Sequence, residues 1–528
     1  MERFKVNREK LKQVGQQHLN LVYNQEEFSN YINQSYRLEG FENQIEEKTN
    51  SYLHSQRDVL VEVLSDQYSH VTNTEKASEN IKLLKSKNTF TVTTGHQLSL
   101  FTGPLYFVLK ILHVIKLSEK LRKEFTNQNF VPIYWMASED HDFEEIQTMN
   151  LFGKSFTWNS EQKGPVGRFT LEGLDQVREE IKAMFSNHPD AEINSLIEAY
   201  KGDDLADATR NLVHKLFEKY GLVIIDPDNA KLKTMFAPIV KKELLESFSF
   251  KAVEQTNELL IKDGAKIQVN PREINLFYIL DGFRKRIIKE NGIFNIEGEK
   301  SFSEKELLVE LDQHPERFSP NAILRPLYQE MILPNLAYVG GAGELSYWLQ
   351  LKRMFDAVNC PYPMIGIRNS VMWIDSTTSK KMTKINLDIS KVFETSDALK
   401  KYFVKNNSEG KLDFEVIDQL QKSLSEEINR LVTSIEPSMK GYASAEDSRL
   451  IKQMESLKAK LIKTSKSKHE SSLKTIDQVI DKLFPNGGLQ ERNMNFFSFC
   501  PNGDYRNVLN ELYNCIDPEE KDLIIIKE

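Results

Sequence analysis

Short apolar segments alternate with helix-length segments through most of the chain. Residues 89 to 94 (TFTVTT) are β-branched and end at Gly95, and an apolar, helix-length segment runs from Pro104 to about Lys123. A second apolar segment, residues 130 to 136 (FVPIYWM), follows it. A strand, a glycine turn, a helix and another strand in this order predict a βαβ unit with parallel strands.

Further strands extend this pattern. Residues 222 to 225 are typical of a buried strand, and residues 337 to 339 of a short strand ahead of a glycine-rich turn and a helix. We therefore predict an α/β fold with a Rossmann-like parallel-sheet core. Residues 266 to 298 contain short apolar stretches separated by turn signals such as Asn270-Pro271, and they predict a β-rich insertion in that core.

Beyond residue 411 the apolar positions are spaced for helices. They recur every three or four residues, and the spacing resumes after a break around Gly441: Ile417, Leu420, Leu424, Ile428, Leu431, Ile435, then Leu450, Met454, Leu457 and Leu461. The apolar stripe is narrow and its surroundings are charged, so such helices bury the stripe in a coiled coil. We predict an antiparallel helical hairpin through which the chain forms a homodimer.

These changes of pattern divide the chain into four expected parts. They are an N-terminal helical segment packed on the core (1–88), the Rossmann-like core with its insertions (89–390), an α-helical coiled coil (391–484) and a C-terminal return to the core (485–528).

Composition narrows the class of protein. Hydrophobic residues make up 40% and charged residues 28%, and the net charge is −8, so nothing attracts the chain as a whole to nucleic acid or an anionic membrane. The first residues lack the apolar stretch of a signal peptide, and no run approaches the ~18 apolar residues of a spanning helix. We expect a cytoplasmic protein that binds neither nucleic acid nor membrane.

The cysteines, Cys360, Cys500 and Cys515, lack the paired spacing of zinc or redox sites, which favours reduced structural thiols over an attacking nucleophile.

Polar residues follow three of the predicted strands, at the edge of the sheet where ligands bind in parallel α/β folds. They are Gly95, His96, Gln97, Thr102 and Gly103 after the first strand, Ser138, Glu139, Asp140, His141 and Asp142 after the second, and Gly340, Gly341, Gly343 and Glu344 after a later one. Glycines at such turns let backbone amides approach a phosphate or a carboxylate. None of these turns matches a Walker or dinucleotide fingerprint, and a plain turn is the alternative interpretation.

Two sets of side chains offer chemistry. The acidic run Glu139 to Asp142 contains groups suited to a general base or to ligands of a hydrated Mg²⁺, and a polar helix start is the alternative. Asn321, Arg325 and Gln329 share one face of a helix by their spacing. Arg325 suits a carboxylate or phosphate through its planar fork of donors, and a structural ion pair is the alternative.

Four segments carry a resemblance to a known family: GHQLSLFTGPLY (95–106), PIYWMASEDHDFEEI (132–146), LRPLYQEMILPNLAYVGGAGELSYWLQLK (324–352) and FPNGGLQER (484–492). In these segments the chain resembles the cysteine-adding enzymes of bacillithiol biosynthesis, the BshC family. The resemblance implies a Rossmann-type core similar to nucleotidyltransferases and class I aminoacyl-tRNA synthetases, two connecting-peptide insertions, and dimers formed through a coiled coil. It also implies a ligase that adds cysteine to glucosaminyl malate. His96 and Ser99 stand where the family pattern has glutamine and glycine.

Amide formation from a free carboxylate is uphill in water, so the carboxylate must first be activated as an acyl phosphate or acyl adenylate. ATP with Mg²⁺ is the simplest source of that activation. The hypothesis is that the glucosamine amine attacks activated cysteine, with backbone amides near Gly95 and Gly341 stabilising negative charge, Arg325 holding a carboxylate, and Asp140 or His141 removing a proton. The alternatives are a metal-dependent hydrolase that uses the 138–142 cluster and a non-catalytic, metabolite-binding dimeric scaffold.

Overall fold

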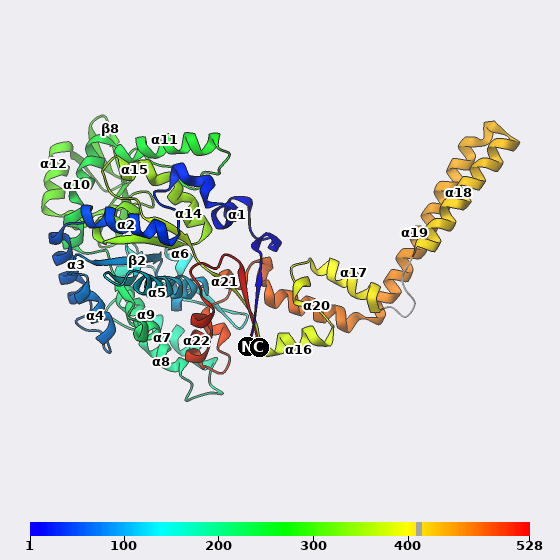
Figure 1. Cartoon of the computed structure of the whole chain (residues 1–528), viewed down its shortest axis with the longest axis horizontal. Helices are drawn as coiled ribbons and strands as arrows, with labels where there is room; N and C mark the ends of the chain where they lie inside the picture. Colours follow the sequence, from blue (N-terminus) through cyan, green and yellow to red (C-terminus); the bar gives the residue numbers. More distant parts are fainter. Residues whose placement is uncertain (408–413) are drawn as a thin grey trace. The chain divides into compact units, whose positions relative to one another are not determined.

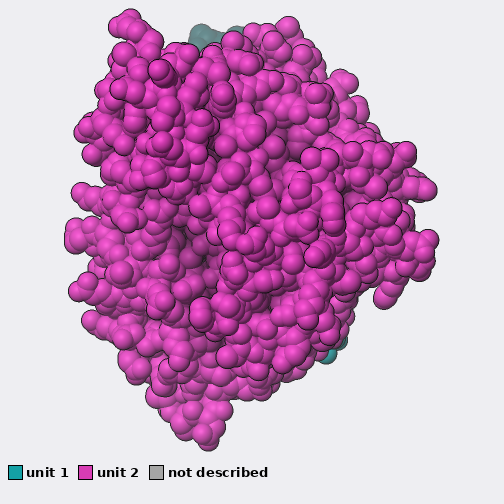
Figure 2. All heavy atoms as spheres, turned by 90° about the vertical axis from the view of Figure 1, so that its left-hand side faces the viewer, with its two compact units in different colours: residues 1–2, 374–487, 527–528 teal, residues 3–373, 488–526 magenta. Residues whose placement is uncertain are grey.

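The computed structural model describes residues 1–407 and 414–528, which form two compact units. The larger unit comprises residues 3–373 and 488–526, and the smaller one comprises residues 374–487 with residues 1–2 and 527–528 (Figure 2). The smaller unit begins at Ile374, ahead of the expected boundary at residue 391, because α16 (Ser376–Lys384) packs on α20 (Glu470–Leu483).

The core of the larger unit is a five-stranded parallel sheet, which confirms the predicted Rossmann-like α/β fold (Figure 1). The order of its strands is β13 (Met364–Ile367), β12 (Asn335–Gly340), β2 (Thr89–His96), β3 (Asn129–Met136) and β6 (Val223–Ile225). Nearly every residue of β2 and β3 is buried, as expected where helices cover a parallel sheet. The crossover helix α5 (Tyr106–Glu124) packs along both of these strands.

Helices precede and follow the strands of this sheet in chain order. The first part of the chain holds β1 (Glu2–Val6), α1 (Gln16–Tyr23), α2 (Leu38–Ser51), α3 (His54–Gln67) and α4 (Glu75–Leu83). Between β3 and β6 lie α6 (Phe143–Ile146), the hairpin β4 (Thr148–Leu151) and β5 (Lys154–Thr157), then α7 (Leu174–Ala183), α8 (Ile193–Ala199) and α9 (Leu205–Phe217). After β6 come α10 (Ala230–Glu246) and α11 (Phe248–Lys262), and around β12 come α13 (Arg325–Ile332), α14 (Ala342–Trp348) and α15 (Lys352–Asp356).

The N-terminal helices are tied to the sheet by a buried ion pair. Lys48 on α2 and Glu330 on α13 lie 3.3 Å apart, and both side chains are shielded from solvent. Asn335 at the start of β12 donates a further hydrogen bond to the Glu330 carboxylate, at 2.6 Å. Removing one partner of such a pair is costly because it leaves a buried charge without compensation.

An antiparallel sheet is inserted between α11 and α13. Its strands, in spatial order, are β10 (Lys300–Ser303), β9 (Ile293–Ile296), β8 (Phe283–Glu290), β7 (Leu276–Leu280) and β11 (Phe318–Pro320), and α12 (Glu304–Gln313) connects β10 to β11. Asn291 and Gly292 both have positive φ, as a tight hairpin turn requires. The predicted β-rich segment, 266–298, covers three of the five strands.

The chain returns to the larger unit through α21 (Gln490–Asn493), α22 (Tyr505–Cys515) and β15 (Leu523–Lys527), which joins a sheet with β1 and β14 (Ser370–Ile374). Helix α22 packs against α5.

The three cysteines are free thiols, and burial raises the pKa of each, to about 12 for Cys360 and Cys515. At neutral pH these thiols are protonated and weakly nucleophilic.

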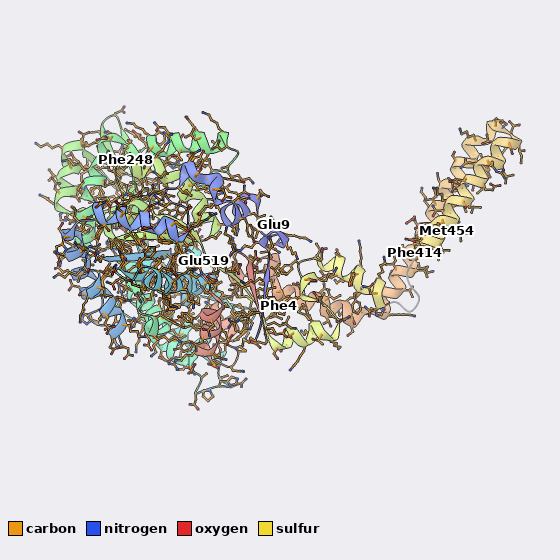
Figure 3. The ribbon with its side chains drawn as sticks, in the orientation of Figure 1. Phe4, Glu9, Phe248, Phe414, Met454 and Glu519 are labelled. Carbon is orange, nitrogen blue, oxygen red and sulfur yellow. The ribbon has the colours of Figure 1, made fainter. Side chains whose placement is uncertain are left out.

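The smaller unit contains the predicted antiparallel coiled coil. Helices α18 (Glu415–Ile435) and α19 (Lys440–Lys468) lie side by side (Figure 1), and their side chains project along the hairpin (Figure 3). The turn between them falls just ahead of Gly441, and across the pair Lys458 donates to Asp418 and the Ser425 hydroxyl donates to Asp447. Helices α16, α17 (Ser396–Asn407) and α20 form the base of the unit.

Within residues 1–407 and 414–528, no helix has the length and apolar character needed to cross a membrane.

Candidate active site

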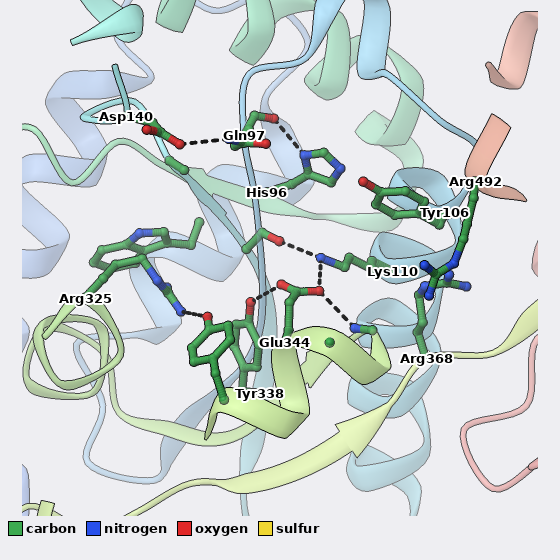
Figure 4. Close-up of a pocket in the computed structure, with 16 residues that line it drawn as sticks. His96, Gln97, Tyr106, Lys110, Asp140, Arg325, Tyr338, Glu344, Arg368 and Arg492 are labelled. Atoms are coloured by element: carbon green, nitrogen blue, oxygen red, sulfur yellow. Dashed lines mark hydrogen bonds and ion pairs between the residues drawn. The ribbon is translucent and has the colours of Figure 1, made fainter. Parts of the chain in front are cut away.

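A cavity of about 610 Å³ opens at the carboxyl ends of β2, β3 and β12 (Figure 4). Several predicted site residues line it: Gly95, His96, Gln97, Asp140, Arg325, Gly341, Gly343 and Glu344. The remaining lining was not predicted, and it consists of Tyr106, Lys110, Trp135, Ala137, Tyr338, Tyr347, Arg368 and Arg492. The parallel sheet brings the ends of separate strands to one edge, so residues far apart in the sequence meet there.

The floor of this first cavity is a charged pair. Lys110 of α5 donates to the Gly95 carbonyl oxygen at 3.0 Å and lies 2.5 Å from the Glu344 carboxylate. Glu344 also accepts hydrogen bonds from the Gly341 N–H and the Tyr338 hydroxyl. Burial alone would raise the pKa of Glu344, but the Lys110 charge and these bonds hold it below its usual value. The Gly341 N–H is therefore already engaged by Glu344, and the predicted role of backbone amides near Gly341 in stabilising negative charge stays a prediction.

Cationic groups surround the same cavity. Arg325 is held by Gln329 at 3.0 Å and lies over the rings of Tyr338 and Trp348. Arg368 forms an ion pair with the buried Glu491 at 2.7 Å. Exposed Arg492, on α21 near the start of the chain segment that returns to the core, completes the set.

Two buried polar atoms at this cavity lack a hydrogen-bond partner anywhere in residues 1–407 and 414–528. They are Nε of Arg368 and Nε2 of His96. Buried polar atoms are almost always satisfied in folded proteins, so two orphaned atoms in the wall of one cavity point to a bound ligand as their partner. A guanidinium N–H suits an anionic oxygen.

Asp140 stands at the far side of this cavity. Its carboxylate accepts hydrogen bonds from Gln97 Nε2 at 2.8 Å and from the backbone N–H of His141 at 2.7 Å. Burial would raise its pKa, but hydrogen bonds from His141 and Gln97 and the charge of Arg284 hold the pKa of Asp140 well below its usual range. The group is a permanent carboxylate at neutral pH.

His141 is placed differently from Asp140. Its side chain is 45% exposed and contributes to the wall of neither cavity described in this section. Its Nδ1 lies 3.1 Å from a guanidinium nitrogen of Arg284, which always carries protons, so Nδ1 is assigned as the acceptor and Nε2 as the protonated nitrogen. The nitrogen of His141 that could accept a proton therefore already accepts a hydrogen bond from Arg284.

The other predicted residues lie outside the cavity walls and make turns, a helix cap or hydrogen bonds in the surrounding structure. Thr102 and Gly103 form a turn with positive φ, and Asn495 donates to the Gly103 carbonyl at 2.7 Å. Ser138 donates to Asp226. The remaining three are Asp142, which caps α6, Gln329, which is buried behind Arg325, and Gly340, whose carbonyl accepts the Arg368 N–H.

A second cavity, of about 460 Å³, adjoins the first. The two share part of their walls, namely Trp135, Ala137, Asp140, Arg325 and Tyr347. The predicted residues Glu139 and Asn321 line the second cavity, and Glu139 forms a buried ion pair with Lys233 of α10. Arg272, Arg284 and Arg286 come from the inserted sheet and the loop before it, and none of them was predicted. Asp140 and Arg325 thus stand where the two cavities meet.

His96 leads to a prediction on acid stability. Burial lowers the pKa of its imidazole from 6.5 to about 3, so between those values the unfolded chain binds a proton that the folded protein excludes. Folding stability therefore falls as pH drops through this window, by about 3 kcal/mol at pH 4 from this group alone. A His96→Gln variant should lose less stability than wild type between pH 8 and pH 4 in urea unfolding, while His70→Gln, at an exposed position, should follow wild type. Identical pH dependence for His96→Gln and wild type would refute the assignment.

The family models that match the chain agree with this architecture. Residues 4–369 match the family model "Bacillithiol biosynthesis BshC, N-terminal Rossmann-like domain", and residues 371–528 match "Bacillithiol biosynthesis BshC, C-terminal coiled-coil domain". The chain is 44% identical to a "Putative cysteine ligase BshC" of Flavobacterium johnsoniae over 88% of each chain, and 42% identical to one of Christiangramia forsetii over 96% of each. A solved structure titled a putative arginyl-tRNA synthetase from Campylobacter jejuni covers 85% of this chain and 99% of its own, with 12% identity and a TM-score of 0.22.

Proposed function

Because the chain belongs to the BshC family, the cysteine ligases of bacillithiol biosynthesis, we propose that it joins the carboxylate of cysteine to the amine of glucosaminyl malate at the expense of ATP. The observation that carries this proposal is the pair of adjoining cavities that meet at Asp140 and Arg325. A ligase of this type must hold an activated acyl group and an amine in neighbouring sites, and proximity of the two supplies much of the rate.

The first cavity suits the nucleotide and the acyl group. Arg368, with its unpartnered Nε, and exposed Arg492 offer donors to phosphate oxygens, and His96 Nε2 offers a further polar contact. Mg²⁺ in ATP-dependent enzymes is commonly held by the phosphates with one or two carboxylates. Within residues 1–407 and 414–528, no group of three or more His, Cys, Asp or Glu side chains is arranged to hold a metal ion.

The proposed reaction has two steps. A carboxylate oxygen of cysteine attacks phosphorus of ATP, and pyrophosphate leaves if the attack is at the α-phosphorus, or ADP if it is at the γ-phosphorus. The glucosamine amine then attacks the carbonyl carbon of the acyl phosphate or adenylate, the new C–N bond forms, and phosphate or AMP departs with one of the original carboxylate oxygens. The amine loses its protons to water or to the departing phosphate oxygen.

Asp140 and Arg325 take complementary roles in this proposal. Arg325 is held in place by Gln329 and by the Tyr338 ring, and its remaining donors suit the cysteine carboxylate. A carboxylate whose pKa lies far below neutrality is a weak proton acceptor, so Asp140 acts by orienting the amine through charge-assisted hydrogen bonds. His141 supports Asp140 through its backbone N–H.

Product formation tests the proposed activity. Purified protein is incubated with glucosaminyl malate, cysteine and ATP, with and without Mg²⁺, and the mixture is followed by mass spectrometry. We expect the cysteinyl amide together with an equal amount of AMP or ADP, and no product when any reactant is omitted. ATP-independent hydrolysis of glucosaminyl malate that stops on chelation would instead support a metal-dependent hydrolase, and no turnover of any kind by folded protein would support a scaffold.

We also propose that the protein is a homodimer formed through the coiled coil. Leu424 and Leu431 on α18 remain 45% and 49% exposed, and further apolar side chains along the hairpin are open to solvent. A second copy of the hairpin would cover this stripe. Light scattering should give twice the chain mass of 61.2 kDa for wild type and a single chain for the Leu424→Lys/Leu431→Lys variant. Ser423→Lys/Ser434→Lys adds the same charge at exposed polar positions and should remain dimeric, and a monomeric wild type would rule out the dimer.

A further inference from the structure

The second cavity carries an excess of positive charge. Four arginines line it, Arg272, Arg284, Arg286 and Arg325, against two carboxylates, Glu139 and Asp140, and the reaction described above uses only Arg325 among these arginines. Glu139 is already neutralised by Lys233. Arg272 and Arg286 are exposed to solvent and Arg284 is half-buried, so the cavity is an open, positively charged site that attracts anions.

Two of these guanidinium groups are free to bind. The side chains of Arg272 and Arg286 form no hydrogen bond or ion pair with any residue that the structure describes. The polar contacts of Arg272 are made by its backbone, whose N–H donates to the Asn275 side chain and whose carbonyl accepts from it. Each guanidinium group therefore presents its full fork of donors to the cavity or to solvent, and such a fork matches the two oxygens of a carboxylate.

Arg284, the third arginine of the inserted sheet and its loop, is fixed by contacts with its neighbours. Its Nε donates to the Ser319 hydroxyl at 3.1 Å, a terminal nitrogen donates to the Pro320 carbonyl at 2.9 Å, and the guanidinium lies 3.9 Å from the centre of the Phe277 ring. These contacts use some of its donors and leave others available. A cation that is already fixed loses little conformational entropy when an anion binds.

The alternation of side chains along β8 places two of the arginines on the face toward the cavity. Side chains alternate between the two faces of a strand, so Arg284 and Arg286 lie on one face and Lys285 lies on the other. Both arginines line the cavity, whereas Lys285 is 3.6 Å from Glu299 in an ion pair of the inserted sheet. Arg284 and Arg286 therefore face the cavity, and Lys285 lies on the opposite face of the strand, where it pairs with Glu299.

We propose that this second cavity is the recognition site for the malyl group, with Arg272, Arg284 and Arg286 binding its two carboxylates. The inference rests on the proposed function for the identity of the ligand. In glucosaminyl malate the malyl group is attached to the sugar carbon next to the one that bears the amine. Anchoring the two carboxylates in the second cavity therefore places the amine near its opening, where Asp140 stands.

The phosphates of a nucleotide share the anionic chemistry that this cavity selects, so the test must separate the two sources. Binding is measured by calorimetry in the absence of a complete reaction mixture, with glucosaminyl malate, methyl glucosaminide (which has the amine but no carboxylates), ATP and pyrophosphate as separate ligands. The proteins are wild type, Arg272→Gln, Arg286→Gln and the matched control Lys285→Gln, which removes the same charge from the opposite face of β8. Thermal unfolding verifies that each variant is folded.

We expect each arginine variant to raise the Kd for glucosaminyl malate by about 10-fold or more, since each removes charge-assisted hydrogen bonds. Lys285→Gln should bind it as wild type does, methyl glucosaminide should bind equally to all four proteins, and ATP should be unaffected. The inference is overturned if the arginine variants bind glucosaminyl malate as tightly as Lys285→Gln, or if they lose ATP or pyrophosphate instead. A wild type that binds no glucosaminyl malate at all would overturn the proposed substrate together with this site.

Discussion

An Asp140→Asn variant is expected to form the cysteinyl amide about 100-fold more slowly than wild type, because it loses the one permanent carboxylate shared by both cavities. Asparagine keeps the size of the side chain, and its one oxygen can still accept from the His141 backbone N–H. It removes the acceptor of the Gln97 hydrogen bond and the negative charge that orients the attacking amine. The loss should appear in kcat measured at saturating glucosaminyl malate, cysteine and ATP.

Asp142→Asn is the matched control for this prediction. Asp142 lies two residues away, caps α6 through its side chain and lines neither cavity. Asparagine is also a good N-cap, so neither activity nor stability should change appreciably. If Asp140→Asn is as active as Asp142→Asn, then the carboxylate of Asp140 has no part in the reaction and the cavities do not meet at the reacting atoms.

The second large effect is expected for Arg325→Lys, which keeps the charge and removes the guanidinium. Arg325 donates to Gln329 at 3.0 Å and lies over the Tyr338 and Trp348 rings, and a lysine ammonium cannot reproduce this planar, stacked arrangement together with a bidentate contact to a carboxylate. We expect kcat/KM for cysteine to fall about 100-fold, which corresponds to the loss of two charge-assisted hydrogen bonds.

A change of stability must be separated from this kinetic effect. Arg353→Lys, at an exposed position on α15, is the control for the loss of a guanidinium and should behave as wild type. Urea unfolding of Arg325→Lys tells whether the protein remains folded under the conditions of the assay. A folded Arg325→Lys variant with wild-type kcat/KM would show that Arg325 only supports the surrounding rings.

The features of the site that could be predicted from the sequence follow from the topology of parallel sheets. Each predicted strand was followed by polar residues, and the parallel sheet brings Gly95, Asp140 and Gly341 to the wall of one cavity. Local patterns suffice for such residues because a strand and the turn after it are neighbours in the sequence. The hairpin of α18 and α19 was predictable for the same reason, since its apolar stripe is a local repeat.

Several charged residues of the two cavities were not predicted, because their positions depend on tertiary packing. Lys110 looks like one polar residue in an apolar helix, and only its contact with Glu344 assigns it to the site. Arg368 follows β13 directly, so the same rule of strand ends would have selected it had that strand been predicted. Arg284 and Arg286 alternate on β8, yet the sequence does not reveal that this face of the inserted sheet lies against the carboxyl ends of the core strands.

In the proposed reaction, the cysteine carboxylate is activated by phosphorus of ATP before the amine attacks. Cysteine labelled with ¹⁸O in both carboxylate oxygens reports this activation, because one labelled oxygen must leave with the phosphorus to which it became bonded. We predict one ¹⁸O in AMP or in inorganic phosphate for every amide formed, and one ¹⁸O retained in the amide carbonyl. Amide formation with no label in AMP or phosphate would contradict activation by ATP and with it the mechanism proposed for the two cavities.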